Sequence, residues 1–175
     1  MTETPTTPTV TGERADLIEA LQAHRGFLRH TVQGLTDDQA RLTPTVSELS
    51  LGGLIKHVAA TERTWVDFVL QGPDAFPAND EATWAARAAE FTLLPDETLA
   101  GVLAGYDEVA HRTDELVATL PDLDASHPLP EAPWFPPDAR RSARRVFVHV
   151  VGETAQHAGH ADVIREAIDG QRTMG

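Results

Sequence analysis

The sequence predicts an all-α protein in which four long helices form a bundle. Four segments repeat apolar residues at the 3.6-residue period of a helix. No segment alternates apolar and polar residues in the way that a half-buried strand does. The connections between the four segments are unequal in length and rich in proline. Together these features favour a helix bundle, a fold that builds ligand sites between facing helices.

The expected helices run from Glu13 to about Leu35, from Leu51 to about Leu70, from Leu99 to Leu120, and from about Arg140 to Asp169. The first carries leucines at helical spacing between charged residues, as an amphipathic helix does. The second follows the capping residues Ser47 and Ser50 and ends before Gly72. The third begins shortly after Pro95, and the fourth ends at Gly170.

Two long connections separate these helices. Residues 72–95 contain three prolines, and one short helical turn is expected over Glu81–Glu90, which includes Trp84. The length of this connection suits the rim of a pocket. Residues 121–137 form a second proline-rich loop, in which Trp134 and Phe135 are adjacent. These two aromatic residues either anchor the loop by packing or line a substrate pocket, and both interpretations stay open.

Composition excludes several classes of function. The formal net charge is −13 and Lys56 is the only lysine. A surface for nucleic acid or anionic lipid needs clustered basic residues, so a small-molecule ligand is favoured. The chain has no cysteine, which excludes disulfides, thiolate metal ligands and a cysteine nucleophile. Any reactive thiol must therefore come from a ligand.

Length and end sequences give the expected organisation and location. Residues 1–11 are rich in threonine and proline, and we expect them to form a disordered leader. Residues 12–175 are long enough for a single domain with its own core. No apolar run approaches the roughly 20 residues that span a bilayer, and the N-terminus lacks the basic and apolar regions of a signal peptide. A cytoplasmic location is expected.

The fourth helix carries a cluster of potential metal ligands. At about 100° per residue, His149, Glu153, His157 and His160 fall within roughly 80° of one another on one face. Glu153 and His157 are one turn apart, a spacing that lets a carboxylate and an imidazole converge on one ion. A catalytic zinc normally takes three protein ligands, so a third must come from elsewhere in the chain. His57, on the inner stripe of the second helix, is the candidate.

Three interpretations of this cluster remain open. Glutamate and histidines could satisfy one another's hydrogen bonds in a purely structural cluster. The same residues could form a solvated polar face without a site. In the third interpretation His57, Glu153 and His157 coordinate a divalent metal and leave a fourth position open.

Two blocks of sequence resemble a known family. They are Ser50–Ala59 (SLGGLIKHVA), followed by Glu62, Arg63 and Trp65, and Glu153–Asp162 (ETAQHAGHAD). Together and in this order they resemble the DinB superfamily, most of all its branch of mycothiol-dependent proteins. The resemblance covers roughly residues 14–170. It implies an up-down-down-up four-helix bundle, a zinc or nickel site at one end, and a homodimer.

The resemblance also implies a metal set and a reaction. Much of the superfamily uses three histidines, whereas this chain has Glu153 in place of one of them. The resulting set of His57, Glu153 and His157 is similar to the zinc site of mycothiol-dependent maleylpyruvate isomerases. The implied activity is that of a metal-dependent S-transferase, in which a low-molecular-weight thiol, mycothiol in the first instance, loses its proton and attacks an electrophilic small molecule.

Further roles and alternatives complete the expectations. His160 is the candidate catalytic residue, which could move the thiol proton or orient the ligands. Arg144 and Arg145 could bind carboxylates of the thiol cofactor or form surface salt bridges. Zinc is the expected metal, with nickel as the second choice. The alternative functions are a metal-dependent hydrolase of the same superfamily, or a metal-stabilised dimeric bundle that binds a ligand without turnover.

Overall fold

The computed structural model describes residues 10–78 and 80–173. Its helices are α1 (Glu13–His30), α2 (Asp37–Arg41), α3 (Leu51–Gln71), the 3₁₀ helix η1 (Gly72–Ala75), α4 (Glu81–Glu90), α5 (Leu99–Thr119) and α6 (Ala143–Asp169). Its strands are β1 (Ser126–Pro128) and β2 (Arg140–Ser142). The leader expected at residues 1–11 lies outside the described residues, except for Val10 and Thr11.

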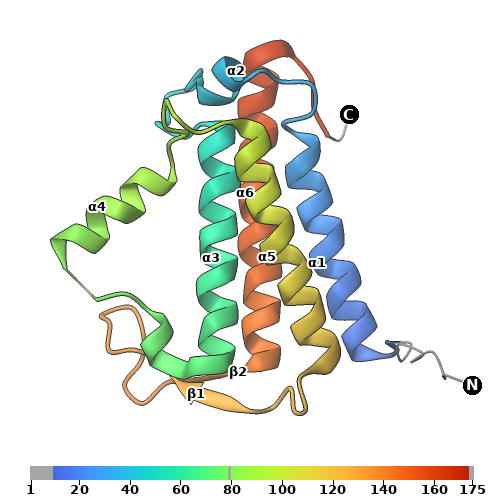
Figure 1. The fold of residues 1–175 in the computed structure, drawn as a ribbon, viewed down its shortest axis with the longest axis vertical. Helices are drawn as coiled ribbons and strands as arrows, with labels where there is room; N and C mark the ends of the chain where they lie inside the picture. The colour runs from blue at the N-terminus through green and yellow to red at the C-terminus, as the bar shows by residue number, and fades with distance from the viewer. Residues whose placement is uncertain (1–9, 79, 174–175) are drawn as a thin grey trace, which may run out of the picture.

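Four long helices lie side by side in this structure. Helix α1 packs against α6 and α5, and α3 packs against α5 and α6. In Figure 1, α1 and α6 run upward while α3 and α5 run downward. Helix α2 covers the upper end, the β1–β2 ribbon closes the lower end, and α4 stands away from the other helices beside α3. The all-α prediction is confirmed by this predominantly helical structure.

Helices α3, α4, α5 and α6 begin where short polar side chains cap them. Ser50, Asp80, Thr98 and Ser142 each accept a hydrogen bond from the backbone N–H three residues later. Such N-caps satisfy backbone donors that the helix itself leaves unpaired. Gly170 ends α6 in the left-handed conformation with φ of 79°, a conformation that favours glycine. The predicted bounds of α4 agree with those in the structure.

Three local predictions were wrong. The first helix ends at His30 instead of near Leu35, and the separate helix α2 follows it, capped by Thr36. A two-stranded antiparallel ribbon pairs Ser126 with Ser142, although no strand was expected. Helix α6 consequently starts at Ala143 and not at Arg140. Each strand has only three residues, too few for an alternating pattern to be recognised.

Two apolar clusters form the core, one toward each end of the long helices. The first contains Leu28, Leu54, Ile55, Tyr106 and Ile164 among others. The second contains Leu21, Trp65, Phe68, Phe147 and Val150 among others. Helix α3 contributes to both clusters, so its backbone is fixed along its whole length. His57 therefore projects from a rigid support.

A polar network is buried among the same helices. The Glu62 side chain of α3 forms an ion pair with Arg25 of α1, and both residues are 1% exposed. Glu62 also accepts a hydrogen bond of 2.5 Å from the Thr113 hydroxyl of α5, while Arg25 binds Asp114 at 2.7 Å. The network joins three helices at their middles, where the paired charges satisfy one another.

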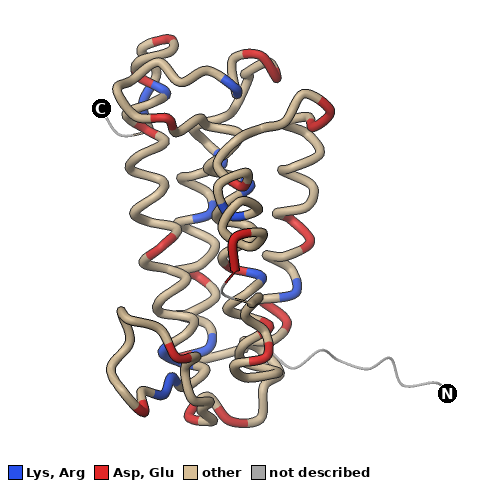
Figure 2. Tube along the Cα trace, turned by 90° about the vertical axis from the view of Figure 1, so that its left-hand side faces the viewer, with Lys and Arg blue, Asp and Glu red and all other residues tan. Residues whose placement is uncertain are grey.

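The surface is predominantly acidic, with 27 acidic and 14 basic residues in the chain. Figure 2 shows acidic residues at both ends of the molecule as well as along the helices. None of the helices in the described residues has the length and apolar character that crossing a bilayer requires.

Candidate metal centre

The face of α6 that carries the histidines lies against α3, and this packing brings the predicted ligands together. The rings of His57 and His157 have centroids 5.0 Å apart and are nearly perpendicular. Glu153 lies 3.9 Å from Nε2 of His157 and 3.6 Å from Nε2 of His149. The structure thus places the three predicted ligands and His149 in one cluster. Over the described residues, however, no three histidine, aspartate, glutamate or cysteine side chains form a ready set of metal ligands.

A residue that the sequence analysis missed holds His57 in place. The carboxylate of Glu90, at the end of α4, lies 3.3 Å from Nδ1 of His57. The ring of Phe91 stacks on the same imidazole at 3.9 Å. These two contacts fix the ring from one side and leave Nε2 on the other, 3.5 Å from the Thr61 hydroxyl. Hydrogen bonds to one ring nitrogen orient the other for ligation.

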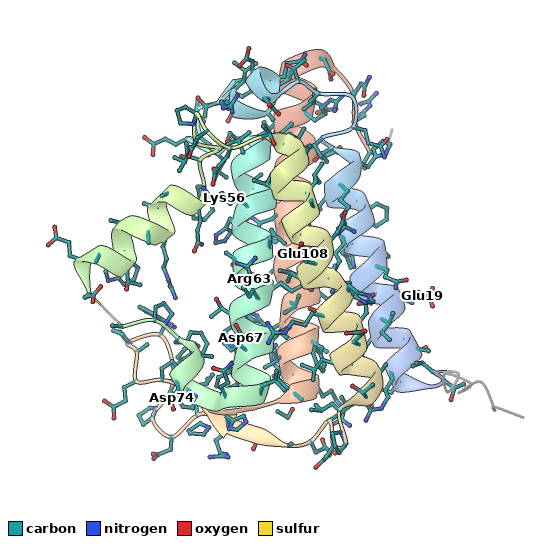
Figure 3. The ribbon with its side chains drawn as sticks, in the orientation of Figure 1. Glu19, Lys56, Arg63, Asp67, Asp74 and Glu108 are labelled. Atoms are coloured by element: carbon teal, nitrogen blue, oxygen red, sulfur yellow. The ribbon has the colours of Figure 1, made fainter. Side chains whose placement is uncertain are left out.

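Burial and nearby basic residues act on the pKa of Glu90 in opposite directions. Burial raises the pKa of its carboxyl above the ordinary value, while Arg87, Lys56 and Arg63 act in the opposite sense. Figure 3 labels Lys56 and Arg63 on α3. Lys56 is itself held by Glu97 at 2.7 Å. The end of α4 is thus tied to α3 by electrostatic contacts as well as by the stacked ring of Phe91.

The pKa values of the histidines in the cluster are lowered, which favours the neutral imidazole. Burial is the largest cause of the shift that brings the pKa of His157 to about 4, and the neighbouring His57 and His160 contribute to the same shift. Burial also lowers the pKa of His57, against the opposing effect of Glu153. The pKa of His149 is lowered by burial and by Arg141. A neutral imidazole has a free lone pair, which is the form that binds a metal.

One atom in the cluster lacks a partner. Nδ1 of His157 is buried, and no hydrogen-bond partner for it exists among the described residues. Buried polar atoms are nearly always paired, so an unpaired imidazole nitrogen calls for an explanation. Glu153 faces the other ring nitrogen, Nε2, at 3.9 Å, and His57, Glu153 and His157 offer two imidazoles and a carboxylate, a donor set typical of zinc. By its chemistry the cluster fits a divalent ion.

The three remaining predicted site residues, His160, Arg144 and Arg145, differ in their position relative to the cluster. His160 is exposed, with its ring centroid 5.5 Å from that of His157. Arg145 is exposed, and its charge lowers the pKa of His149, one turn further along α6. Arg144 pairs with Glu13 and Asp124 instead. His160 and Arg145 therefore border the cluster, whereas the guanidinium of Arg144 is engaged with acidic residues outside it.

A cavity of about 530 Å³ adjoins the cluster. Its walls come from α3, from α4 with the residues preceding it, and from the loop at residues 130–135, and His57 forms part of the α3 wall. The aromatic residues that line it are Trp65, Phe76, Trp84, Phe91, Trp134 and Phe135. Trp134 and Phe135 both line the pocket, which is one of the two interpretations left open by the sequence. Phe135 also packs against the second apolar cluster, so it serves as an anchor as well.

Arg141 stands behind one wall of the cavity and was not anticipated. Its guanidinium lies 4.5 Å from the ring of Trp65 and 5.5 Å from that of Phe135. Burial lowers the pKa of Arg141, and the charge of Arg145 adds to this effect. No sequence spacing links Arg141 to Trp65, since the contact arises from the packing of the β1–β2 ribbon under α3.

Comparison with known proteins gives a family match and a similar fold. The family model described as Mycothiol-S-transferase matches residues 16–170. No curated protein matches the chain significantly. A crystal structure of a conserved protein of locus from Enterococcus faecalis is similar at a TM-score of 0.69, with 14% sequence identity over 93% of this chain and 100% of that one. At this identity the likeness concerns the fold alone.

Proposed function

The chain belongs to the mycothiol S-transferase family, which is DinB-like, and from this membership we propose that it joins mycothiol to an electrophilic small molecule with the help of a divalent metal. The observation that carries the proposal is the clustering of two imidazoles and a carboxylate, since the rings of His57 and His157 lie 5.0 Å apart and Glu153 lies 3.9 Å from Nε2 of His157. The absence of cysteine supports a thiol that arrives as a cosubstrate.

The proposed metal ligands are His57, Glu153 and His157, with zinc as the first choice and nickel as the second. When bound there, the ion supplies acidity, because a divalent cation lowers the pKa of a coordinating thiol. The single carboxylate among the ligands leaves the site a net positive charge, which favours an anionic sulfur.

The chain's own side chains have separate tasks in this proposal. Glu90 and Phe91 orient His57, and His160, exposed at the border of the cluster, accepts the thiol proton and passes it to solvent. Arg145 binds an anionic or polar group of the thiol cofactor, while Arg144 serves as an anchor between α6 and its acidic partners. The sulfur forms a bond to the electrophilic carbon as the leaving group departs with its electron pair.

We further assign the chain the up-down-down-up bundle of the DinB type, as a single domain over residues 12–175. The course of the four long helices in Figure 1 supports this arrangement. We also propose a homodimer and a cytoplasmic location. The dimer is supported by the outward face of α6, where Val148 and Val163 are 50% and 61% exposed.

The test is metal analysis of the purified protein, followed by conjugation of mycothiol to iodoacetamide with and without a chelator. The chain has no cysteine, so consumption of thiol reports on mycothiol alone. We expect about one divalent ion per chain and a rate that falls at least tenfold with chelator or with His57→Ala. His111→Ala is the matched control, because the His111 side chain is 77% exposed on α5. If chelator leaves the conjugation rate unchanged, the reaction does not depend on a metal. If the electrophile is hydrolysed without consumption of thiol, the hydrolase is the better assignment.

A further inference from the structure

We propose that the aromatic cavity beside His57 binds an uncharged planar aromatic group of the electrophilic substrate. The cavity and the histidine cluster share His57 as a common wall. A group held in the cavity therefore lies next to the site at which the thiol reacts. The choice of substrate class rests on the proposed function, whereas the binding itself can be measured without any reaction.

The rings that line the cavity are arranged for contact with a flat group. Trp84 of α4 and Trp134 of the loop meet nearly perpendicularly, with centroids 6.5 Å apart. Trp65 lies deeper, where its ring meets that of Phe76 at 5.1 Å. Aromatic side chains favour stacked or edge-to-face contacts with another ring. A volume of about 530 Å³ is within the range of small-molecule pockets.

The exposure of the two rim tryptophans points to a ligand. Trp84 and Trp134 are 50% and 59% exposed, although both are large and apolar. Neither belongs to the two core clusters, so burial in the core does not account for their position. Exposed apolar surface around a concave pocket is characteristic of binding sites. A planar aromatic ligand would cover both rings.

The charged side chains of the cavity argue for an uncharged ligand. Glu90 is engaged with Nδ1 of His57 at 3.3 Å, and the guanidinium of Arg87 lies 5.8 Å from the ring of Trp84. The remaining charged wall residue is Glu131, which is exposed at the rim. Recognition of a carboxylate needs convergent basic groups, and Arg87 is the single arginine or lysine among the described lining residues. A cationic ligand would meet the like charge of Arg87, which already lies against the ring of Trp84.

Binding is tested by calorimetry with N-(1-naphthyl)acetamide, which is uncharged and unreactive, in the absence of thiol. We expect Trp84→Ala and Trp134→Ala each to weaken binding about tenfold. Both positions are exposed, so the variants should keep the circular dichroism spectrum of the wild type. Phe27→Ala is the matched control, because Phe27 is 45% exposed on α1, away from the cavity, and should leave binding unchanged.

Two charged probes with the same ring, 1-naphthylacetate and 1-naphthylmethylammonium, test the class of ligand. We expect both to bind at least tenfold more weakly than the amide. Tighter binding of either charged probe, or amide binding that neither tryptophan substitution weakens, would overturn the proposal.

The link to the reaction is tested with two electrophiles that share one reactive carbon, N-(1-naphthyl)iodoacetamide and iodoacetamide. In both reactions a C–S bond forms, the C–I bond breaks, iodide leaves with the electron pair, and the thiol proton goes to solvent. Trp134→Ala should raise the KM for the naphthyl compound about tenfold and leave that for iodoacetamide unchanged. Equal effects on both compounds would overturn the link. If the amide probe binds but neither compound is conjugated, the proposed function fails while the subsite stands.

Discussion

The imidazole of His157 makes the stability of the metal-free protein depend on pH. Folding lowers the pKa of His157 from its ordinary value of 6.5 to about 4. Below pH 6.5 the unfolded chain therefore binds a proton that the folded chain does not, so the free energy of unfolding falls as the pH drops toward 4. His57 and His149 shift in the same direction and add to this loss.

We expect the melting temperature in the presence of chelator to decrease from about pH 7 to about pH 5, and to decrease less in His157→Gln. Thermal unfolding followed by circular dichroism measures both. His111→Gln is the control, since that side chain is mostly exposed. An equal decrease in the wild type and in His157→Gln would show that His157 does not carry the effect.

Substitution of Glu153 distinguishes a metal ligand from a hydrogen-bonding residue. Glu153→Gln keeps the shape of the side chain but replaces an anionic ligand with a neutral amide, so we expect the metal content to fall. Glu153→His retains a competent ligand and should hold metal better than the glutamine variant. If Glu153 serves only as a hydrogen-bonding residue, Glu153→Gln should retain more metal than Glu153→His, because glutamine can still hydrogen-bond to His157.

Metal content of the two variants, measured side by side after identical purification, decides between these outcomes. Glu166→Gln on the exposed face of the same helix is the control and should retain all of its metal. Full metal in Glu153→Gln together with loss in Glu153→His would remove Glu153 from the ligand set.

At the scale of elements, the N-terminal turn of α3 depends on a close approach between backbones. A Cβ atom added to Gly53 would lie 1.8 Å from the carbonyl oxygen of Phe91. The segment at residue 91 leads from α4 to α5 and carries the ring that stacks on His57. We therefore expect Gly53→Ala to lower the free energy of unfolding by about 2 kcal/mol, within the usual cost of overpacking, and also to weaken metal binding.

Gly105 is the matched control for this change. It lies inside α5, and a Cβ atom there would meet nothing within 4 Å. Alanine is the better helix former, so Gly105→Ala should raise the free energy of unfolding by about 0.5–1 kcal/mol. Urea denaturation measures both variants. Retention of wild-type stability by Gly53→Ala would show that the connection at residue 91 moves without cost.

The buried ion pair between α1 and α3 gives a second prediction at this scale. Glu62→Gln leaves Arg25 without a full counter-charge in a position that is 1% exposed. Breaking a buried pair by removing one partner costs about 3–5 kcal/mol, although Asp114 retains part of the compensation here. We expect a loss near the lower end of that range in urea denaturation.

The exposed pair of Arg29 and Asp107 provides the comparison, since the Asp107 side chain is 68% exposed. Asp107→Asn should change the free energy of unfolding by less than about 1 kcal/mol. If both variants lose a similar free energy of unfolding, burial does not make the Glu62 ion pair more important than the exposed one.

These elements also show what sequence could predict. The starts of α1, α3 and α5 agree with the prediction from the 3.6-residue period, whereas that of α6 does not. The Glu153 and His157 pair follows from its spacing on one helix. The contacts of Glu90 with His57 and of Arg141 with Trp65 come from the packing of α4 and of the β1–β2 ribbon. Such tertiary contacts leave no periodic signal in the sequence.

At the scale of the whole molecule, the cavity exists because α4, with the residues that precede it, and the loop at residues 130–135 meet beside α3. Helix α4 has no buried residue, so its position depends on the contacts at its two ends and on the rim tryptophans. Elements with few buried contacts are the ones that open most easily. A ligand that spans Trp84 and Trp134 would therefore stabilise α4 together with the loop.

The outward face of α6 carries the last prediction, a homodimer. Val148 is 50% exposed and Val163 is 61% exposed on this face. Cβ atoms added to Gly152 and Gly159 would meet nothing within 4 Å. Small and apolar residues along one face allow two helices to approach closely, and a two-fold axis would pair this face with its own copy.

Light scattering at micromolar concentration should give about twice the mass of the 19.0 kDa chain. Val163→Glu places a charge in the centre of that contact and should produce monomers, because an unpaired carboxylate is costly to bury. Val46→Glu is the control, since Val46 is fully exposed in the connection between α2 and α3 and should remain dimeric. A wild-type mass of 19.0 kDa would exclude the dimer. If Val163→Glu remains dimeric, residue 163 is not buried in the dimer, and the interface lies on another face of the protein.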